Sequence, residues 1–100
     1  MTTRPVLSEV LKVLRERQDA TRANRFEIVG VFGSVARGEA GPDSDVDIVI
    51  RAIDPKANLF DMGAIWSDLS EALGRSVDLV ETDALRPSFR QAVERDLAVL

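Results

Sequence analysis

Hydrophobic and polar residues follow two different periods along this chain, and they predict helices and strands in turn. From Pro5 to Ala23, apolar residues recur at helical spacing and charged residues fall between them, which is typical of an amphipathic helix. Thr3 is the predicted N-cap of this helix. Two short apolar runs, Phe26–Phe32 and Val46–Ile53, have the length and composition of buried strands. The first half of the chain therefore predicts a helix followed by two strands.

The second half of the chain repeats this alternation. A helix that ends at Gly74 is predicted by an apolar stripe consisting of Leu59, Met62, Ile65, Trp66, Leu69 and Leu73. The β-branched run Val77–Val80 predicts a third strand, with Asp78 in its middle. Thr82 is placed to cap a final helical segment whose packing stripe is Phe89, Val93 and Leu97.

This order predicts an α/β (α+β) fold in one domain spanning residues 1–100. We expect a small mixed β-sheet with helices packed on one face, which leaves the other face for substrate. No apolar run approaches the ~18 residues of a membrane span, and the N-terminus lacks the apolar block of a secretion signal. We therefore expect a cytoplasmic protein that has no membrane partner.

Composition narrows the chemistry that this fold can carry out. The formal net charge is −4, and a protein that binds the phosphate backbone normally carries a basic face, so the charge argues against nucleic acid as the main partner. The chain has no cysteine and no histidine, which removes thiolate metal ligands and the usual general base. Any catalysis must therefore use carboxylates, hydroxyls and metal ions.

The turn after the first predicted strand has the features of an anion site. Gly33 ends that strand where a side chain would obstruct the approach of a ligand to the backbone. Residues Ser34 to Arg37 are expected to open a short helix whose free N–H groups and Ser34 hydroxyl point to an anion. A Walker P-loop is excluded because no Gly-Lys-Ser/Thr follows. Arg37 could reach phosphate oxygens, although a structural role is the preferred interpretation.

Two carboxylates open the second predicted strand. In an extended strand, Asp45 and Asp47 would lie on one face about 6.5 Å apart, a pair that suits Mg²⁺ or Mn²⁺ bound together with substrate phosphates. With Asp43 they also imitate the start of a calcium-binding EF-hand loop. That alternative is disfavoured because Ile48 stands where the loop needs glycine and Asp54 where it needs glutamate.

These motifs together resemble a known family. Gly33-Ser34, then Ser44-Asp45-Val46-Asp47 and later Asp78, are similar to the nucleotidyltransferase superfamily of the DNA polymerase β type. The match is to its smallest members, the minimal nucleotidyltransferases (MNT domains), which are often encoded beside a HEPN-domain toxin. The resemblance covers nearly the whole chain and implies the polymerase β-like nucleotidyltransferase fold.

The resemblance also implies roles for individual residues. Asp45 and Asp47 would bridge two Mg²⁺ ions, for which Mn²⁺ could substitute, and Asp78 would complete the shell of the second ion. Gly33 and Ser34 would hold the triphosphate of ATP. Two further residues, Arg37 and Ser44, complete the set of nucleotide-binding residues that it implies.

The implied reaction is the transfer of AMP from ATP to a hydroxyl of a partner protein. Some members of the family are antitoxins that adenylylate a tyrosine of a HEPN ribonuclease toxin. This chain contains no tyrosine, so a tyrosine acceptor must belong to another molecule. A non-catalytic module that neutralises its partner by occlusion is the alternative. An enzyme that modifies small molecules is disfavoured by the short chain, because larger relatives add a domain for the acceptor.

Overall fold

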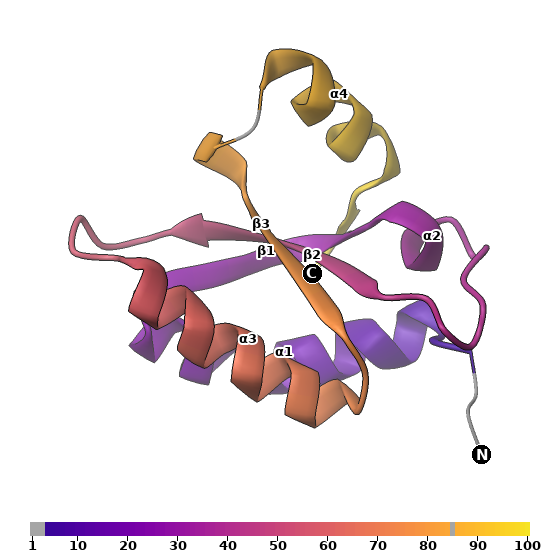
Figure 1. Ribbon diagram of the computed structural model, residues 1–100, viewed down its shortest axis with the longest axis horizontal. Coiled ribbons are helices and arrows are strands. Elements are labelled where there is room, and N and C mark those ends of the chain that lie inside the picture. The colour runs from indigo at the N-terminus through magenta and orange to yellow at the C-terminus, as the bar shows by residue number, and fades with distance from the viewer. Residues whose placement is uncertain (1–3, 85) are drawn as a thin grey trace.

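The computed structural model describes residues 4–84 and 86–100, which form a four-stranded mixed sheet with helices on both sides (Figure 1). The strand order is β3-β2-β1-β4, in which β1 is antiparallel to β2 and β4, and β2 is parallel to β3. The elements are α1 (Leu7–Ala23), β1 (Phe26–Phe32), α2 (Gly33–Ala36), β2 (Val46–Ala52), α3 (Leu59–Leu73), β3 (Val77–Glu81), the 3₁₀ turn η1 (Thr82–Ala84), α4 (Pro87–Asp96) and β4 (Ala98–Val99).

The main core lies between the sheet and the pair of helices α1 and α3, which cover the same face (Figure 1). Alternate residues of β2 point into this core because successive side chains of a strand face opposite sides. Val46, Ile48 and Ile50 are each 0 % exposed. The other face of β2 therefore carries Asp47, Val49 and Arg51. The expected mixed α/β fold is confirmed.

Helix α1 begins later than the sequence predicts. Its first residue is Leu7, and Val6 occupies the N-cap position without a side-chain hydrogen bond. Pro5 therefore precedes the helix, while the predicted cap Thr3 lies outside the described residues. An ion pair joins the helices of this layer, since Arg17 donates to both carboxylate oxygens of Asp68, at 3.0 and 2.5 Å.

Helix α3 has well-formed caps at both ends. Asn58 and Asp61 form a capping box, and Gly74 adopts the left-handed conformation (φ 66°) that ends the helix as predicted. The predicted stripe is correct for its centre, because Ile65 and Leu69 are buried. It is wrong at its edges, where Leu59 is 80 % and Trp66 50 % exposed.

The C-terminal segment departs most from prediction. Thr82 begins the short η1 turn, while the α-helix starts separately at Pro87 and ends before Leu97. Val93 is buried, but Phe89 is half-exposed. Helix α4 lies across the sheet from α1 and α3, on the side where an open face was expected (Figure 1). The short strand β4, which was not predicted, then pairs with β1.

The close approach of β4 explains one glycine of β1. A Cβ atom placed on Gly30 would lie 2.2 Å from the backbone oxygen of Ala98. Only a shift of the backbone could relieve this clash. Glycine is therefore required here for contact between strands. Within the described part of the chain, no helix is long and apolar enough to cross a membrane.

We predict opposite effects for two glycine-to-alanine substitutions. Gly30→Ala should lower the free energy of unfolding by about 1–3 kcal/mol, because the added methyl group is forced against β4. Gly63→Ala is the matched control, since Gly63 is exposed in α3 and its added Cβ would meet nothing within 4 Å. It should raise stability by about 0.5–1 kcal/mol through helix propensity. Urea unfolding measures both effects, and an undiminished stability of Gly30→Ala would contradict the pairing of β4 with β1.

Candidate functional site

The candidate site is centred on two carboxylates that the sheet places side by side. In the parallel ladder of β2 and β3, Asp47 is in register with Asp78, and across the antiparallel ladder Phe32 is in register with Asp47. Adjacent strands lie about 4.8 Å apart, so the two aspartates project together from the face opposite the main core. The sequence spacing places Asp45 on the same face as Asp47, and the family resemblance adds Asp78 to this pair. The residue paired with Asp47 across the sheet is Asp78.

The carboxyl group of Asp47 has a perturbed affinity for protons. Its pKa is raised above the ordinary value, first by partial burial and then by the negative charges of Asp78 and Asp45. A hydrogen bond with Asp78 raises it further, while the positive charge of Arg37 lowers it. Crowding of the aspartates therefore adds to the effect of burial on this pKa. Asp45 itself is exposed just before β2.

The glycine-serine turn lies directly against the carboxylate of Asp47. Gly33 has a φ of +74°, which an L side chain rarely adopts, and a Cβ atom there would lie 2.4 Å from Oδ2 of Asp47. A side chain at this position is therefore disfavoured by the backbone conformation, and it would displace the Asp47 carboxylate. The turn continues into α2, where the backbone oxygen of Ser34 accepts a hydrogen bond from the N–H of Glu39 at 2.9 Å. This geometry brings Gly33, Ser34 and Asp47 together.

Arg37 connects the end of α2 to α4. Its guanidinium donates to Glu39 at 3.0 Å and to Asp96 at 2.9 Å. The preferred interpretation of Arg37 as a structural residue agrees with these contacts, although its charge is also felt at Asp47. Sequence reasoning did not identify Asp96, because a pairing between residues 59 positions apart leaves no local pattern.

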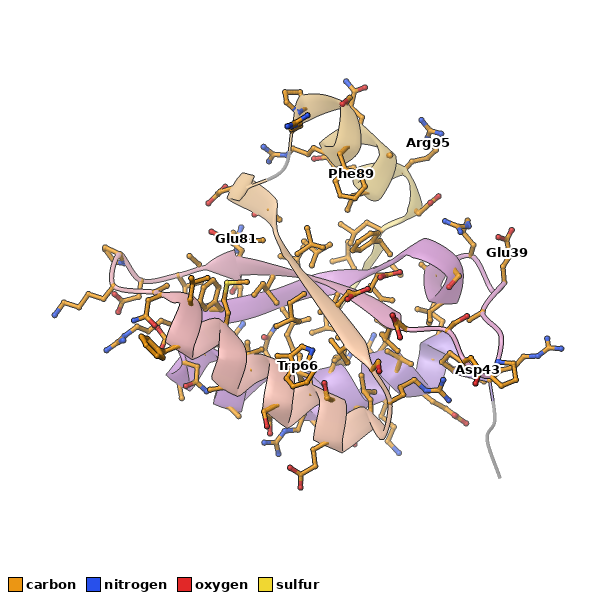
Figure 2. All side chains as sticks on the ribbon, viewed as in Figure 1. Glu39, Asp43, Trp66, Glu81, Phe89 and Arg95 are labelled. Carbon is orange, nitrogen blue, oxygen red and sulfur yellow. The ribbon has the colours of Figure 1, made fainter. Side chains whose placement is uncertain are left out.

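Ser44 closes the loop that precedes β2. Its Oγ accepts a hydrogen bond from the N–H of Gly41 at 2.9 Å, and its own N–H donates to the Gly41 oxygen at 3.2 Å. These contacts give Ser44 a role in shaping the loop. Asp43 is an exposed member of the same loop (Figure 2).

Trp66 supports the edge strand that carries Asp78. The indole N–H donates to the backbone oxygen of Val77 at 2.8 Å, and Figure 2 shows Trp66 between α3 and β3. The backbone oxygen of Ser76 faces β2, where it accepts a hydrogen bond from the N–H of Val46. Because successive carbonyls of a strand point to opposite sides, the Val77 oxygen faces away from β2. Trp66 thus satisfies a carbonyl at the open edge of the sheet. The sequence placed this residue in the core instead.

The donor chemistry of the site fits a divalent cation. Carboxylate oxygens are hard ligands, and Mg²⁺ is usually held by one or two carboxylates together with substrate phosphates. Asp47 and Asp78 provide such a pair, and their mutual repulsion is what a cation relieves. Within the described residues, no three His, Cys, Asp or Glu side chains are grouped so that they could hold a metal ion by themselves. The protein therefore offers part of a coordination shell that phosphate oxygens can complete.

The arrangement defines a class of protein. The sequence profile of the nucleotidyltransferase domain family matches residues 7–100. This chain belongs to that family, and it is a nucleotidyltransferase of the minimal type.

Three relatives show how far the similarity extends. Protein adenylyltransferase MntA of Thermococcus cleftensis is 34% identical over 93 residues, which cover 91% of this chain and 92% of that protein. A solved structure described as a candidate minimal nucleotidyltransferase has a TM-score of 0.72 and 36% identity, and the match covers 90% of this chain and 95% of the other. A toxin-antitoxin crystal structure with AMP-PNP has a TM-score of 0.61 and 26% identity over 86% of this chain and 64% of that one.

The raised pKa of Asp47 predicts how stability depends on pH. A carboxyl group whose pKa is higher in the folded state binds its proton more tightly there, so its contribution to stability falls as pH rises above 3.8, its ordinary value, through the raised pKa. In metal-free buffer, Asp47→Asn should therefore melt higher than the native protein at pH 7. This difference should disappear near pH 3, where Asp47 is protonated in both states.

Thermal melts across this pH range, followed by circular dichroism, measure the effect. Asp43→Asn is the matched control, because it makes the same chemical change in an exposed loop. A lower melting temperature for Asp47→Asn at pH 7 would contradict the repulsion between carboxylates.

Proposed function

We propose that the chain acts as one nucleotidyltransferase domain that transfers AMP from ATP to a hydroxyl of a partner protein. The observation that carries this proposal is the pairing of Asp47 and Asp78 beside the side-chain-free turn at Gly33. Anionic phosphates need such a turn for close approach to the backbone, and the carboxylate pair supplies ligands for the cation that accompanies them. Phosphoryl transfer depends mainly on this kind of positioning and charge stabilisation.

Each residue of the site has a defined part in this proposal. Asp45, Asp47 and Asp78 would hold up to two divalent ions, Mg²⁺ or Mn²⁺, whose chemistry would be to neutralise phosphate charge and to favour ionisation of the acceptor hydroxyl. Gly33 and Ser34 orient the β- and γ-phosphates. Arg37 keeps the turn in place through its pairs with Glu39 and Asp96.

The proposed reaction forms one bond and breaks another. The acceptor oxygen bonds to the α-phosphorus of ATP as the bond from that phosphorus to the bridging oxygen breaks, and pyrophosphate leaves. Asp78 is exposed on the edge strand, where an incoming hydroxyl can reach it and transfer its proton. Holding that hydroxyl in line is the proximity effect that makes the transfer efficient.

We further propose that the acceptor is a tyrosine of a HEPN-type toxin and that this chain is its antitoxin. The relative from Thermococcus cleftensis is named a protein adenylyltransferase, and the structure with AMP-PNP is a toxin-antitoxin complex. The absence of tyrosine from this chain agrees with an acceptor on another molecule. Neutralisation by occlusion is the second candidate, supported by exposed apolar side chains such as Phe60, which is 91 % exposed.

A transfer assay tests the catalytic proposal. With Mg²⁺ and α-labelled ATP, the purified protein should label a tyrosine of the toxin encoded beside it, and mass spectrometry locates the label. Asp47→Asn should lower the rate at least ~100-fold, because it removes a metal ligand from the reacting centre. Asp43→Asn should retain the rate, as its side chain lies outside the site. Tight binding and neutralisation without any label would identify occlusion as the function.

Nucleotide binding should also stabilise the fold. A ligand that binds only the native state stabilises it by RT ln(1 + [L]/Kd), about 2.7 kcal/mol at a hundredfold excess over Kd. Mg²⁺ with ATP should therefore raise the melting temperature of the native protein. The double variant Asp45→Asn/Asp47→Asn should lose most of this shift while remaining folded. A full shift in the double variant would show that these aspartates do not hold the metal and nucleotide.

A further inference from the structure

The two edges of the sheet differ in how far other segments cover them. At the edge formed by β1, the side chain of Gln18 takes the place of a neighbouring strand. Its Nε2 donates to the backbone oxygen of Ile28 at 2.9 Å, and its Oε1 accepts from the N–H of Ile28 at 2.8 Å. The N–H of Leu100 donates to the Val29 oxygen at 3.1 Å, and β4 pairs with β1 just beyond. This edge is therefore covered along consecutive parts of β1.

The outward side of β3, which we call the β3 edge, has no such cover. In the part of the chain that the structure describes, β3 pairs with β2 alone, and Figure 1 shows it in front of the other strands with no element before it. The Ser76 oxygen accepts from β2, so the backbone groups of Val77 and Leu79 point outward. Trp66 donates to the Val77 oxygen. Within residues 4–84 and 86–100, the outward N–H and oxygen of Leu79 have no hydrogen-bond partner.

Unpaired backbone groups on an edge strand can pair with another extended chain. Recognition by strand addition obtains its affinity from main-chain hydrogen bonds, which suits a flexible segment of another protein. A strand added to β3 would lie about 4.8 Å from it. The residue of that strand in register with Asp78 would project its side chain from the face that carries Asp78 and Asp47. The β3 edge therefore leads an extended segment directly past the carboxylates.

The charge of the β3 edge decides between two kinds of occupant. From residue 76 to residue 84 the sequence contains Asp78, Glu81 and Asp83 and no lysine or arginine. A second copy of this chain would bring the same acidic residues to the edge, and like charges opposite each other destabilise a pair of strands. A segment that carries lysine or arginine beside its acceptor residue complements this charge instead.

We propose that the β3 edge binds an extended, basic segment of the acceptor protein as an additional strand, with the acceptor residue in register with Asp78. This inference rests on the proposed function, which it deepens by assigning how the acceptor reaches the site. In this register a tyrosine hydroxyl, at the far end of its ring, extends beyond the Asp78 carboxylate. A serine hydroxyl stays next to the backbone. The geometry therefore favours tyrosine over serine as the acceptor.

Synthetic peptides test this pairing through their own backbone. A short fluorescent peptide of lysine, threonine and valine, with one central tyrosine, is titrated with the full chain in the absence of ATP, and fluorescence anisotropy measures binding. One modified form is N-methylated on both neighbours of the tyrosine, and the other on the tyrosine and the next residue but one. Because N–H groups alternate in direction along a strand, one form alone should lose its bonds to β3, and its affinity should fall at least ~5-fold. The other form should bind like the unmodified peptide.

Leu79→Pro makes the same test from the side of the protein. Proline removes the outward N–H of Leu79, and an edge strand tolerates it where that N–H faces solvent. Peptide binding should weaken roughly three- to tenfold through the lost hydrogen bond, and labelling of the tyrosine with Mg²⁺ and α-labelled ATP should fall with it. The melting shift produced by Mg²⁺ with ATP should remain, because the donor site is unchanged.

Leu79→Ala is the matched control, since it removes the same side chain and keeps the N–H. It should bind the peptide like the native protein. If Leu79→Pro fails to fold, the two methylated peptides decide, because they leave the protein unaltered.

Several results would overturn the inference. Failure of the native protein to bind the peptide, or equal affinity for the two methylated forms, would show that the acceptor binds elsewhere and would leave the transfer proposal intact. A native dimer that Leu79→Pro converts to a monomer in analytical ultracentrifugation would assign the β3 edge to a second copy. A peptide that binds with the predicted alternation, while neither it nor the adjacent toxin is ever labelled, would support the binding edge and remove the proposed transfer.

Discussion

Repulsion between Asp47 and Asp78 is the constraint on which the rest of the structure depends. Parallel pairing of β2 and β3 fixes their register, so the backbone positions of the two aspartates remain adjacent as long as the ladder is intact. Burial first, and then the charges of Asp78 and Asp45, raise the pKa of Asp47, so keeping this carboxylate ionised in the fold costs free energy. The cost is met by the fully buried residues on the other face of β2, such as Ile48 and Ile50, whose burial stabilises the strand by about 1.5–3 kcal/mol per side chain. Strand β2 therefore carries Asp47 on one face and, on the other face, the buried residues that stabilise the strand.

The edges of the sheet explain why a short strand suffices to hold Asp78. An edge strand has ladder hydrogen bonds on one side only, and β3 spans just Val77–Glu81. The indole N–H of Trp66 donates a hydrogen bond to the outward-facing carbonyl of Val77, the residue before Asp78. At the opposite edge, β4 can approach β1 only because Gly30 has no side chain. At each edge of the sheet, one residue therefore makes the contact possible: Trp66 at β3 and Gly30 at β1.

Local patterns allowed much of this fold to be predicted. The strands β1 and β2 follow from apolar runs, and the end of α3 follows from Gly74, because burial and left-handed backbone each leave a signature in neighbouring residues. The two residues of β4 leave no such signature, because their pairing with β1 is a contact between segments far apart in the sequence. The pairing of Asp47 with Asp78 is not visible in local spacing for the same reason. Spacing of two favoured Asp45, whereas the register between β2 and β3 brings Asp78 alongside.

The return of the chain through α4 changes what the site can do. A sheet with one bare face would expose a nucleotide to water along its whole length. Here α4 crosses that face, and its C-terminal end is held twice: Asp96, its last residue, pairs with Arg37, and β4, which follows directly, pairs with β1. The carboxylates remain accessible beside this helix, because Asp78 is exposed on the edge strand. The geometry therefore separates a region of the sheet covered by α4 from an open edge at β3, where Asp78 is accessible.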